Sequence, residues 1–522
     1  MKKVKLPVIL LCLLLFSGCG KVPAATAVEP KVPGEENITS MEEEPVISYE
    51  VPESIPGILV NQLGYLPTGT KKAVFQGKEI PHVFHVIKEE TGEIVFIGRP
   101  DEEVYDKAKD EYISYGDFSQ VKAEGTYYIE APILGRSYSF MIEENIYDDM
   151  FREACKQYYY NRCGMTLTEA FAGSAAHNAC HIGNAVLVED ISVSMDVTGG
   201  WHQDEKGQKS VVAASGAIAR MCLSYELYPK AFTDDMGIPE SGNEIPDLLD
   251  EIKYEVDLLL KMQDAKTGAV YAGISVFTPG LDASGKASDI YVEPASAAAE
   301  KAFAMALAKF SYLYQQYDAA FATTCLKAAD RAYKHALLHE EEADSMLFAA
   351  AAELYRAAGQ QSFHQQVTSY LQNNKENLYE DEMDLLGGVT YLSTKHRVRT
   401  DLCEEIMERL MSRAEEISLE SKEALYLTKG NEAQDNNMEL LSDMMYLAVV
   451  NYIISNHEYE TVIEDHLHYF LGRNAKAISY VENTGERGYE QAAGTLGLMK
   501  QFETDSKFIF MLSEVVINGG RK

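Results

Sequence analysis

The hydrophobic pattern of the chain changes near Tyr147, and this change constrains the fold more than any other feature. From Ile58 to Met141 the apolar residues come in short runs, rich in β-branched and aromatic side chains and separated by turn residues such as Thr91-Gly92. Such runs are typical of a β-sandwich. Beyond Tyr147, apolar residues recur at spacings of three and four, which predicts amphipathic helices. We therefore expect an all-β N-terminal region followed by an all-α region.

The expected strands and helices follow from these two periods. Strands are predicted within 58–67, 82–87, 93–97, 112–114, 125–129 and 136–141. Helices are predicted at 151–160, from Val211, at 245–260, 295–317, 321–336, 344–358, 439–455 and 459–471. For the helix at 245–260, Asn243 is a candidate cap and Pro246 suits the first turn.

The N-terminus has the pattern of a targeting segment. Lys2, Lys3 and Lys5 precede an apolar run from Leu6 to Phe16, and Ser17-Gly18-Cys19 follows. A charged start, a short apolar run and small residues at the end are typical of a signal peptide, and the ending resembles a bacterial lipobox. We expect a signal peptide at 1–18, lipid modification of Cys19 and attachment to the bacterial cell surface. The alternatives are an ordinary secretory signal or a membrane helix.

Composition limits the remaining possibilities. Residues 19–56 are rich in Pro, Glu, Ala and Thr, which predicts a flexible tether. The net charge of −35 argues against a nucleic-acid partner, because a phosphate backbone requires clustered Lys and Arg. Cys222 and Cys325 fall in apolar helical patterns and are expected to be buried free thiols.

One segment then gives a family resemblance. Asp196-Val-Thr-Gly-Gly-Trp-His202 places the only tryptophan of the chain, Trp201, after a Gly-Gly pair. This stretch resembles the active-site loop of glycoside hydrolase family 9, the cellulase family with an (α/α)6 barrel. An ungapped alignment puts Gln203 and Lys206 where the family has its two aspartates, and Lys209 matches again.

Further motifs in the same order extend the resemblance. Ile245-Pro-Asp-Leu-Leu-Asp-Glu251 and Phe470-Leu-Gly-Arg-Asn474 resemble helix and loop motifs of the family, and Val60-Asn-Gln-Leu-Gly-Tyr65 resembles its N-terminal immunoglobulin-like module. The resemblance implies an immunoglobulin-like β-sandwich at 57–144 and an (α/α)6 barrel at 147–522. In the family the module mostly buttresses the barrel, and carbohydrate binding is the alternative.

The resemblance also implies inverting hydrolysis of β-1,4-glucan, which requires two carboxyl groups across the scissile bond. Ser513-Glu-Val-Val-Ile-Asn518 is similar to the family motif that carries the acid, which makes Glu514 the candidate acid. Asp204, with Glu205 beside it, is the candidate relocated base, unless both are solvated loop charges. Trp201 and Arg487 are the candidate sugar contacts.

Because both family aspartates are replaced, a second hypothesis stands beside the enzyme. A family 9 scaffold without catalysis would bind a surface glycan or another partner, or would be purely structural. Under each hypothesis we expect a monomer that contacts the membrane through its lipid.

Four residues form a candidate metal set: Cys163, Cys180, His181 and His202. Two Cys and two His suit tetrahedral structural zinc, although their spacing is not that of a zinc finger. The positions coincide with the zinc ligands of some family 9 enzymes that carry the immunoglobulin-like module. His177 is a possible substitute ligand. The alternative is a buried Cys pair with ordinary loop histidines, and no pattern defines a calcium site.

Overall fold

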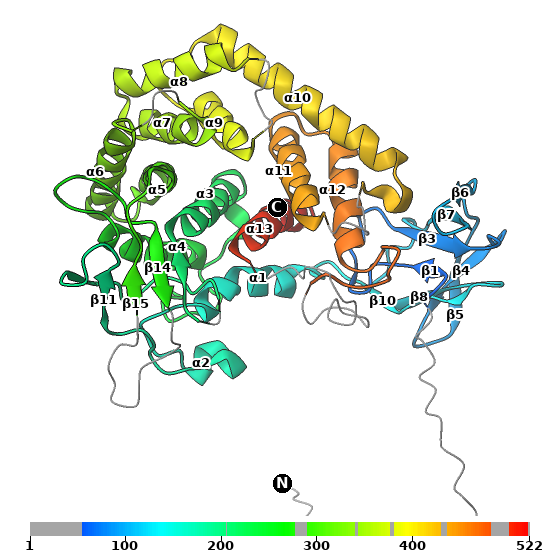
Figure 1. Ribbon diagram of the computed structural model, residues 1–522. Coiled ribbons are helices and arrows are strands. Elements are labelled where there is room, and N and C mark those ends of the chain that lie inside the picture. The colour runs from blue at the N-terminus through cyan, green and yellow to red at the C-terminus, as the bar shows by residue number, and fades with distance from the viewer. Residues whose placement is uncertain are drawn as a thin grey trace, which may run out of the picture. The chain divides into compact units, whose positions relative to one another are not determined.

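The structure is a computed structural model, and it describes residues 55–204, 206–276, 290–339, 343–375, 381–429, 436–481 and 501–519. These residues form a β-sandwich followed by a helical domain (Figure 1). The predicted combination of an all-β and an all-α region is therefore confirmed. In the described ranges, no helix combines the length and the apolar character that crossing a membrane requires.

Two sheets make up the sandwich, and the predicted strands lie within them to a few residues. One sheet has the order β1 (Ile58–Leu59), β3 (Lys72–Gly77), β7 (Glu111–Asp117) and β6 (Val104–Asp106). The other has the order β2 (Gly64–Tyr65), β10 (Phe140–Ile142), β8 (Gly125–Ala131), β4 (Phe84–Lys88) and β5 (Glu93–Gly98), with β9 (Gly135–Arg136) paired to β8. Buried aromatic side chains fill the space between the sheets, among them Phe75, Phe84 and Phe140.

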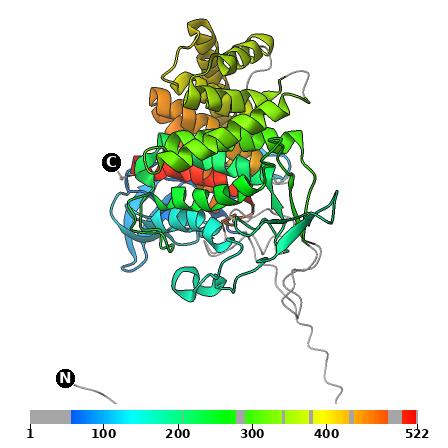
Figure 2. The ribbon, with the colours of Figure 1, turned by 90° about the vertical axis from the view of Figure 1, so that its left-hand side faces the viewer.

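Among the described residues of the helical domain, six apolar helices form the inner layer. They are α3 (Val211–Leu227), α5 (Ala297–Tyr314), α7 (Ser345–Ala358), α9 (Glu382–Ser393), α11 (Asn437–Ile454) and α13 (Phe502–Gly519). Helices α1 (Asp148–Tyr160), α4 (Asp247–Lys261), α6 (Ala319–Ala336), α8 (Gln361–Asn373), α10 (Thr400–Glu423) and α12 (His457–Phe470) pack outside them. Helix α13, red in both views, lies among the other inner helices (Figures 1 and 2).

The composition of each helix explains its layer. Nearly every residue of α5 is buried, and alanines at many positions allow its neighbours to approach closely. Outer helix α6 is instead amphipathic, with buried residues such as Ala322 and Cys325 on one face. Cys222 and Cys325 are buried free thiols, as expected. Ser296 and Asp344 cap inner helices by accepting hydrogen bonds from backbone N–H groups.

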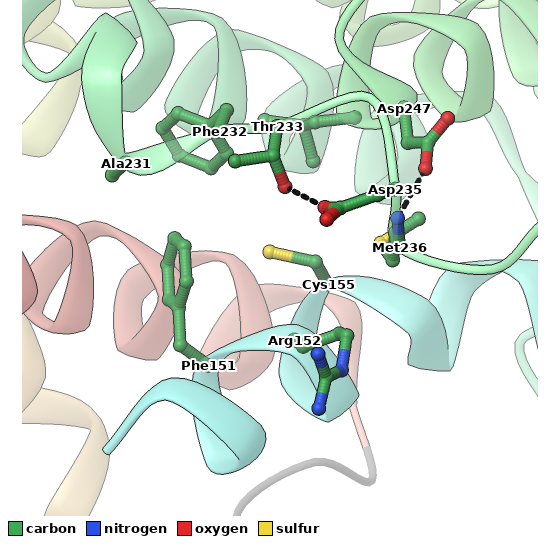
Figure 3. Close-up of a pocket in the computed structure, with 10 residues that line it drawn as sticks. Phe151, Arg152, Cys155, Ala231, Phe232, Thr233, Asp235, Met236 and Asp247 are labelled. Atoms are coloured by element: carbon green, nitrogen blue, oxygen red, sulfur yellow. Dashed lines mark hydrogen bonds between the residues drawn. The ribbon is translucent and has the colours of Figure 1, made fainter. Parts of the chain in front are cut away.

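The start of α4 differs from the sequence prediction. Asn243 does not cap this helix, because Pro246 occupies the capping position and the Asn243 side chain instead donates to Asp250. Asp247 accepts hydrogen bonds from the Met236 N–H and the Ser241 hydroxyl and so fixes the preceding loop. This loop and α1 enclose a cavity of about 110 Å³ (Figure 3), which none of the predicted site residues lines.

A small sheet in the helical domain was not predicted. Its order is β12 (Ser194–Asp196), β11 (Asn184–Leu187), β15 (Ile290–Val292), β14 (Gly273–Val276) and β13 (Lys209–Ser210). The strands have two to four residues, too few for a period-two pattern to be visible in the sequence.

The motif Val60–Tyr65 joins the sandwich to the helical domain. The Asn61 amide lies 3.1 Å from His468 Nδ1 and donates to the Tyr147 hydroxyl. The Gln62 amide donates to the Ala477 carbonyl at 2.7 Å, and its backbone N–H donates to Leu471. Asn61 and Gln62 are both buried. The motif therefore connects the β-sandwich to the helical domain through buried hydrogen bonds.

Candidate functional site

The segment Asp196–Val212 is held first by pairing with the chain that follows α1. Arg162 and Trp201 form an antiparallel bridge. The Cys163 N–H donates to the Gly200 carbonyl at 2.7 Å, and the His202 N–H donates to Asn161 at 2.8 Å. Residues 161–163 and 200–202 therefore pair like two short antiparallel strands. This pairing brings Cys163 and His202 close together.

Two glutamates of α4 hold Trp201 from the other side. The indole N–H donates to Glu251 Oε1 at 2.7 Å, and the backbone N–H donates to Glu255 Oε2 at 2.6 Å. Arg162 forms a buried ion pair with Glu251 at 2.9 Å. Glu251, the last residue of the motif Ile245–Glu251, and Glu255, four residues later, thus accept the two N–H groups of Trp201. Buried N–H groups require such acceptors.

Trp201 lies in the core and not on a sugar-binding surface. Its side chain is fully buried, and its ring packs against Tyr158 and Phe502 with centroid distances of 4.7 and 5.5 Å. The predicted role of Trp201 as a sugar contact is therefore not supported, because no face of the indole is exposed for stacking.

Burial sets the electrostatics of the two glutamates. Burial raises the pKa of Glu255 to about 7, although the nearby Lys209 charge lowers it. Burial also raises the pKa of Glu251, against the opposing charge of Arg162. The loop is thus attached to α4 through two carboxyl groups. Glu251 is paired with the Arg162 cation, and Glu255 changes its protonation near neutral pH.

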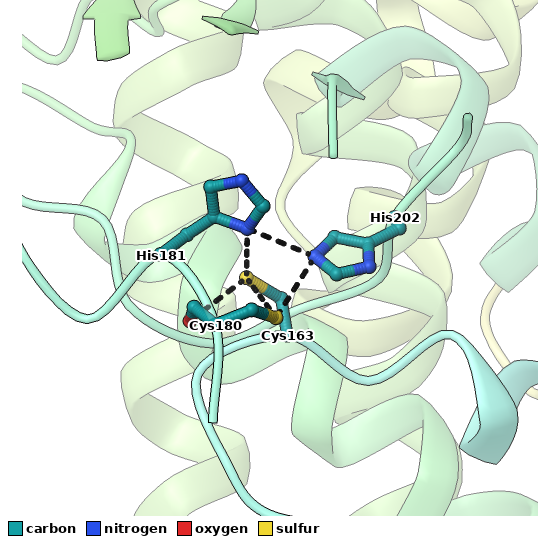
Figure 4. A group of neighbouring side chains, drawn as sticks. All are labelled: Cys163, Cys180, His181 and His202. Atoms are coloured by element: carbon teal, nitrogen blue, oxygen red, sulfur yellow. Dashed lines mark hydrogen bonds between the residues drawn. The ribbon is translucent and has the colours of Figure 1, made fainter. Parts of the chain in front are cut away.

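The four predicted metal ligands come together (Figure 4). Cys163, Cys180, His181 and His202 place their ligand atoms within 4.8 Å of one another. The two sulfurs are 3.9 Å apart, and the two imidazole nitrogens, His181 Nδ1 and His202 Nε2, are 3.2 Å apart. The sulfur-to-nitrogen distances are 3.6 Å from Cys163 to His181 and 3.4 Å from Cys180 to His202. His177 lies outside the cluster, where its Nδ1 contacts the Asn178 carbonyl.

These distances fit a tetrahedral metal ion. Bonds of about 2.3 Å to sulfur and about 2.0 Å to nitrogen give tetrahedral edges of about 3.8 Å between sulfurs, about 3.5 Å between sulfur and nitrogen and about 3.3 Å between nitrogens. The observed separations agree with these edges. A disulfide is excluded, because it would need the sulfurs about 2.05 Å apart, and both cysteines are free thiols.

The chain is strained to make this cluster. His181 has φ of 48°, an uncommon value for a residue with a side chain. Its imidazole lies against Gly207, where a Cβ atom would come within 2.4 Å of the ring. Gly207 itself has φ of 88°. Both observations indicate that the loop from Trp201 to Lys209 is shaped around the His181 ring.

Gln203 and Lys206, the two residues that the resemblance aligns with the family aspartates, lie in different surroundings. The Gln203 amide donates to the Ser210 carbonyl at 2.9 Å, and Lys206 is exposed. Asp204 is exposed, and its Oδ1 accepts the backbone N–H groups of Lys206 and Gln208 at 3.0 and 2.9 Å. One oxygen of Asp204 therefore stabilises the loop. Glu205 and Arg487 lie outside the described residues.

Glu514 is far from this loop. It is buried, and Asn451 donates to its Oε1 at 2.9 Å. Its neighbour Ser513 contacts Ser224 of α3 at 2.8 Å. Ser224 lies thirteen positions after the first residue of α3, about 20 Å along that helix. The structure does not bring the two predicted catalytic carboxyl groups, Glu514 and Asp204, together.

A different glutamate, Glu503, lies at the loop end of α13. Phe502 packs against Trp201, and its carbonyl accepts the Tyr158 hydroxyl at 3.1 Å, so this end of α13 lies beside the loop. Glu503 is the next residue, and its side chain is 51% exposed. Glu503 was not identified from the sequence, because the motif at 513–518 assigned the acid to Glu514, near the other end of the helix. The available signal was an acidic residue in a helix's first turn.

Glu503 belongs to a group of charges that joins three inner helices. Lys507 Nζ lies 3.0 Å from Glu503 and 2.8 Å from Glu382. Arg220 contacts Glu382 at 2.5 Å and Glu503 at 3.6 Å. Burial raises the pKa of Glu382, but the charges of Arg220 and Lys507 outweigh burial and leave this pKa below its ordinary value. Glu382 is thus a carboxylate, and Glu503 is the more exposed member of the pair.

The Gly-Gly pair allows a test of the loop's packing. A Cβ atom at Gly200 would lie 2.3 Å from Leu258, whereas one at Gly199 would meet nothing within 4 Å. Both glycines have positive φ, so both substitutions strain the backbone. We expect Gly200→Ala to lower the free energy of unfolding by about 1–3 kcal/mol more than Gly199→Ala, measured by urea denaturation. Equal losses would contradict the close approach of the loop to α4.

The raised pKa of Glu255 predicts a pH dependence of stability. Since burial raises its pKa from the ordinary value of 4.5 to about 7, the folded state binds more protons than the unfolded state between these pH values, and stability falls as pH rises. Glu255→Gln removes the titrating carboxyl group and with it this pH dependence. We expect the variant to gain stability relative to the wild type, by about 1–3 kcal/mol, from pH 4.5 to 7 in thermal unfolding. Parallel pH profiles would contradict this assignment.

Comparisons with known proteins agree with the geometry. Residues 147–493 match the family model "Glycosyl hydrolase family 9", and residues 53–136 match "Cellulase N-terminal ig-like domain". Endoglucanase D of Acetivibrio thermocellus is 29% identical over 460 residues, which cover 82% of this chain and 73% of that protein.

Two solved structures share the fold. A metagenome-derived glycoside hydrolase family 9 endoglucanase superposes with a TM-score of 0.79 at 22% identity, over 88% of this chain and 98% of that one. A Zn-binding triple mutant of family 9 endoglucanase J30 gives 0.76 at 23% identity, over 86% and 99%. With its sandwich, its helical barrel and its Trp201 loop, this chain belongs to glycosyl hydrolase family 9.

Proposed function

We propose that this chain hydrolyses β-1,4-linked glucan with inversion, at the end of the barrel where the Trp201 loop meets α13. Its family and the endoglucanase activity named for its relatives support this substrate. The observation that supports the proposal is the contact between Phe502, the residue before Glu503, and Trp201, three positions before Asp204. In this proposal Glu503, and not Glu514, is the acid.

The chemistry requires one proton donor and one acceptor. Glu503 donates its proton to the glycosidic oxygen as the bond to the anomeric carbon breaks, and Asp204 takes a proton from the water that attacks that carbon. Asp204 Oδ1 is fixed by the N–H groups of Lys206 and Gln208, so Oδ2 is the oxygen that receives the proton. The exposure of Glu503 gives a glycosidic oxygen access to its carboxyl group.

A second function is favoured by specific contacts. Gln203 and Lys206 replace the family aspartates, one Asp204 oxygen serves the loop, and Glu503 forms an ion pair with Lys507. In this alternative the same end of the barrel binds glucan without cleaving it.

A matched set of variants separates these functions. We expect wild type to release reducing sugar from soluble β-glucan, and Glu503→Gln and Asp204→Asn each to lose about 100-fold or more of kcat, as expected for loss of an acid or base. Glu514→Gln, on the same helix, should retain activity within a few fold. Activity lost only in Glu514→Gln would restore the sequence-based acid. Glucan binding by calorimetry without release would favour the non-catalytic function.

The metal of the cysteine and histidine cluster is zinc in this proposal. Cys163, Cys180, His181 and His202 would supply the four ligands, and a closed tetrahedral set of this kind serves structure. Zinc would tie the chain after α1 to the Trp201 loop. The tetrahedral separations support this assignment, and a Zn-binding triple mutant of family 9 endoglucanase J30 has the same fold.

Zinc content gives a direct test. We expect one zinc per chain in the purified wild type by mass spectrometry of metals, and loss of zinc together with a fall in Tm of several degrees in Cys180→Ser. Cys403→Ser is the control, because Cys403 is a free thiol outside the cluster. Protein purified without zinc, or full zinc retention in Cys180→Ser, would contradict the proposal.

The N-terminus places this function at the cell surface in our proposal. Lipid on Cys19 would anchor the chain to the membrane, with residues 19–56 as a tether and the chain as a monomer. We expect Cys19→Ala to move the protein from the membrane fraction to the soluble fraction in a bacterial host that processes lipoproteins, measured by immunoblot. An unchanged membrane fraction would contradict lipid anchoring.

A further inference from the structure

Strand β5 is an edge strand with an unusually apolar surface. It ends the order of its sheet and pairs only with β4 among the described strands (Figure 1). Ile94, Val95 and Ile97 are 47%, 39% and 64% exposed. Natural sheets usually protect such edges with charges, prolines or covering elements, because an apolar edge pairs readily with other chains. The exposed aliphatic residues of β5 therefore indicate a surface for a partner.

A groove lies beside this edge. It is lined by Ile97 and Gly98 of β5, by the following residues Arg99 to Glu103, and by Ile80 to Val83 before β4. Its volume is about 910 Å³. Ile97 belongs to both the exposed strand and the groove, so a chain paired with β5 would direct some of its side chains into the groove, since alternate residues of a strand face the same side.

The charge around the edge defines the partner's chemistry. Glu93 opens β5, and Asp101, Glu102 and Glu103 line the groove, all of them exposed. Arg99 is the one Lys or Arg among the lining residues. A second copy of this chain would bring the same acidic residues and a net charge of −35. Repulsion between like charges disfavours that occupant and favours a basic one.

We infer that β5 and its groove form a docking edge for an extended, basic polypeptide segment of a partner protein. The segment adds a strand to β5 through backbone hydrogen bonds, places apolar side chains over Ile97 and places Lys or Arg side chains near Asp101 to Glu103. This is strand addition at a sheet edge, in which the backbone gives affinity and the pockets give specificity. The inference does not depend on the proposed hydrolysis.

The test uses a labelled peptide of four Lys-Val repeats and the full chain, with binding measured by fluorescence anisotropy. A peptide of four Lys-Pro repeats has equal charge, but it lacks a backbone N–H donor at every second residue and favours the polyproline II conformation over a β-strand. We expect the Lys-Val peptide to bind at least tenfold more tightly than the Lys-Pro peptide, and its affinity to fall as salt is raised.

Two variants locate the binding. Ile97→Lys should weaken Lys-Val binding at least tenfold, whereas Ile133→Lys, at an equally exposed isoleucine of the same domain (69% exposed), should leave it unchanged. Equal weakening by both variants, or equal binding of both peptides, would overturn the inference in favour of non-specific charge attraction. A concentration-dependent dimer in ultracentrifugation that Ile97→Lys abolishes would also overturn it, because the occupant would then be a second copy.

Discussion

The attachment of Trp201 to helix α4 is the interaction on which the functional end of the barrel depends. Two buried glutamates one helical turn apart, Glu251 and Glu255, accept the indole and backbone N–H groups of this residue. A loop held in this way has little freedom, because breaking either bond would leave a buried N–H donor of Trp201 unsatisfied. The same close approach to α4 explains why position 200 is a glycine, since any Cβ atom there would collide with this helix.

Two further contacts start from this fixed residue. Phe502 packs on the indole and sets where α13 begins, and this brings Glu503 to the loop. The next residue, His202, joins the cluster of cysteines and histidines, whose separations match the edges of a tetrahedron around a metal ion. A buried tryptophan thus connects the cluster of cysteines and histidines to the end of the helix that carries the exposed carboxyl group. Asp204 lies two residues beyond the cluster, on a turn that its own carboxylate stabilises.

The sequence predicted those features that depend on period or on residue type. Long amphipathic segments such as 321–336 predicted helices with nearly the correct ends. The cluster was predicted from its two Cys and two His together with the resemblance of these positions to the zinc ligands of some family 9 enzymes. Position along a helix was harder to predict. The six residues 513–518, which include Glu514, resemble a catalytic motif, but a motif does not specify which end of a helix faces a loop. The short strands β11–β15 and the burial of Trp201 depend on contacts between distant segments, which no local pattern reveals.

In our proposal, glucan binds where the Trp201 loop meets the start of α13. A crystal structure of the Glu503→Gln variant with cellotetraose tests it most directly. We expect a sugar chain beside Gln203 and Asp204, with the amide at position 503 within about 3 Å of a glycosidic oxygen, which is hydrogen-bond reach. Sugar bound beside Glu514, or at a site remote from both glutamates, would contradict it.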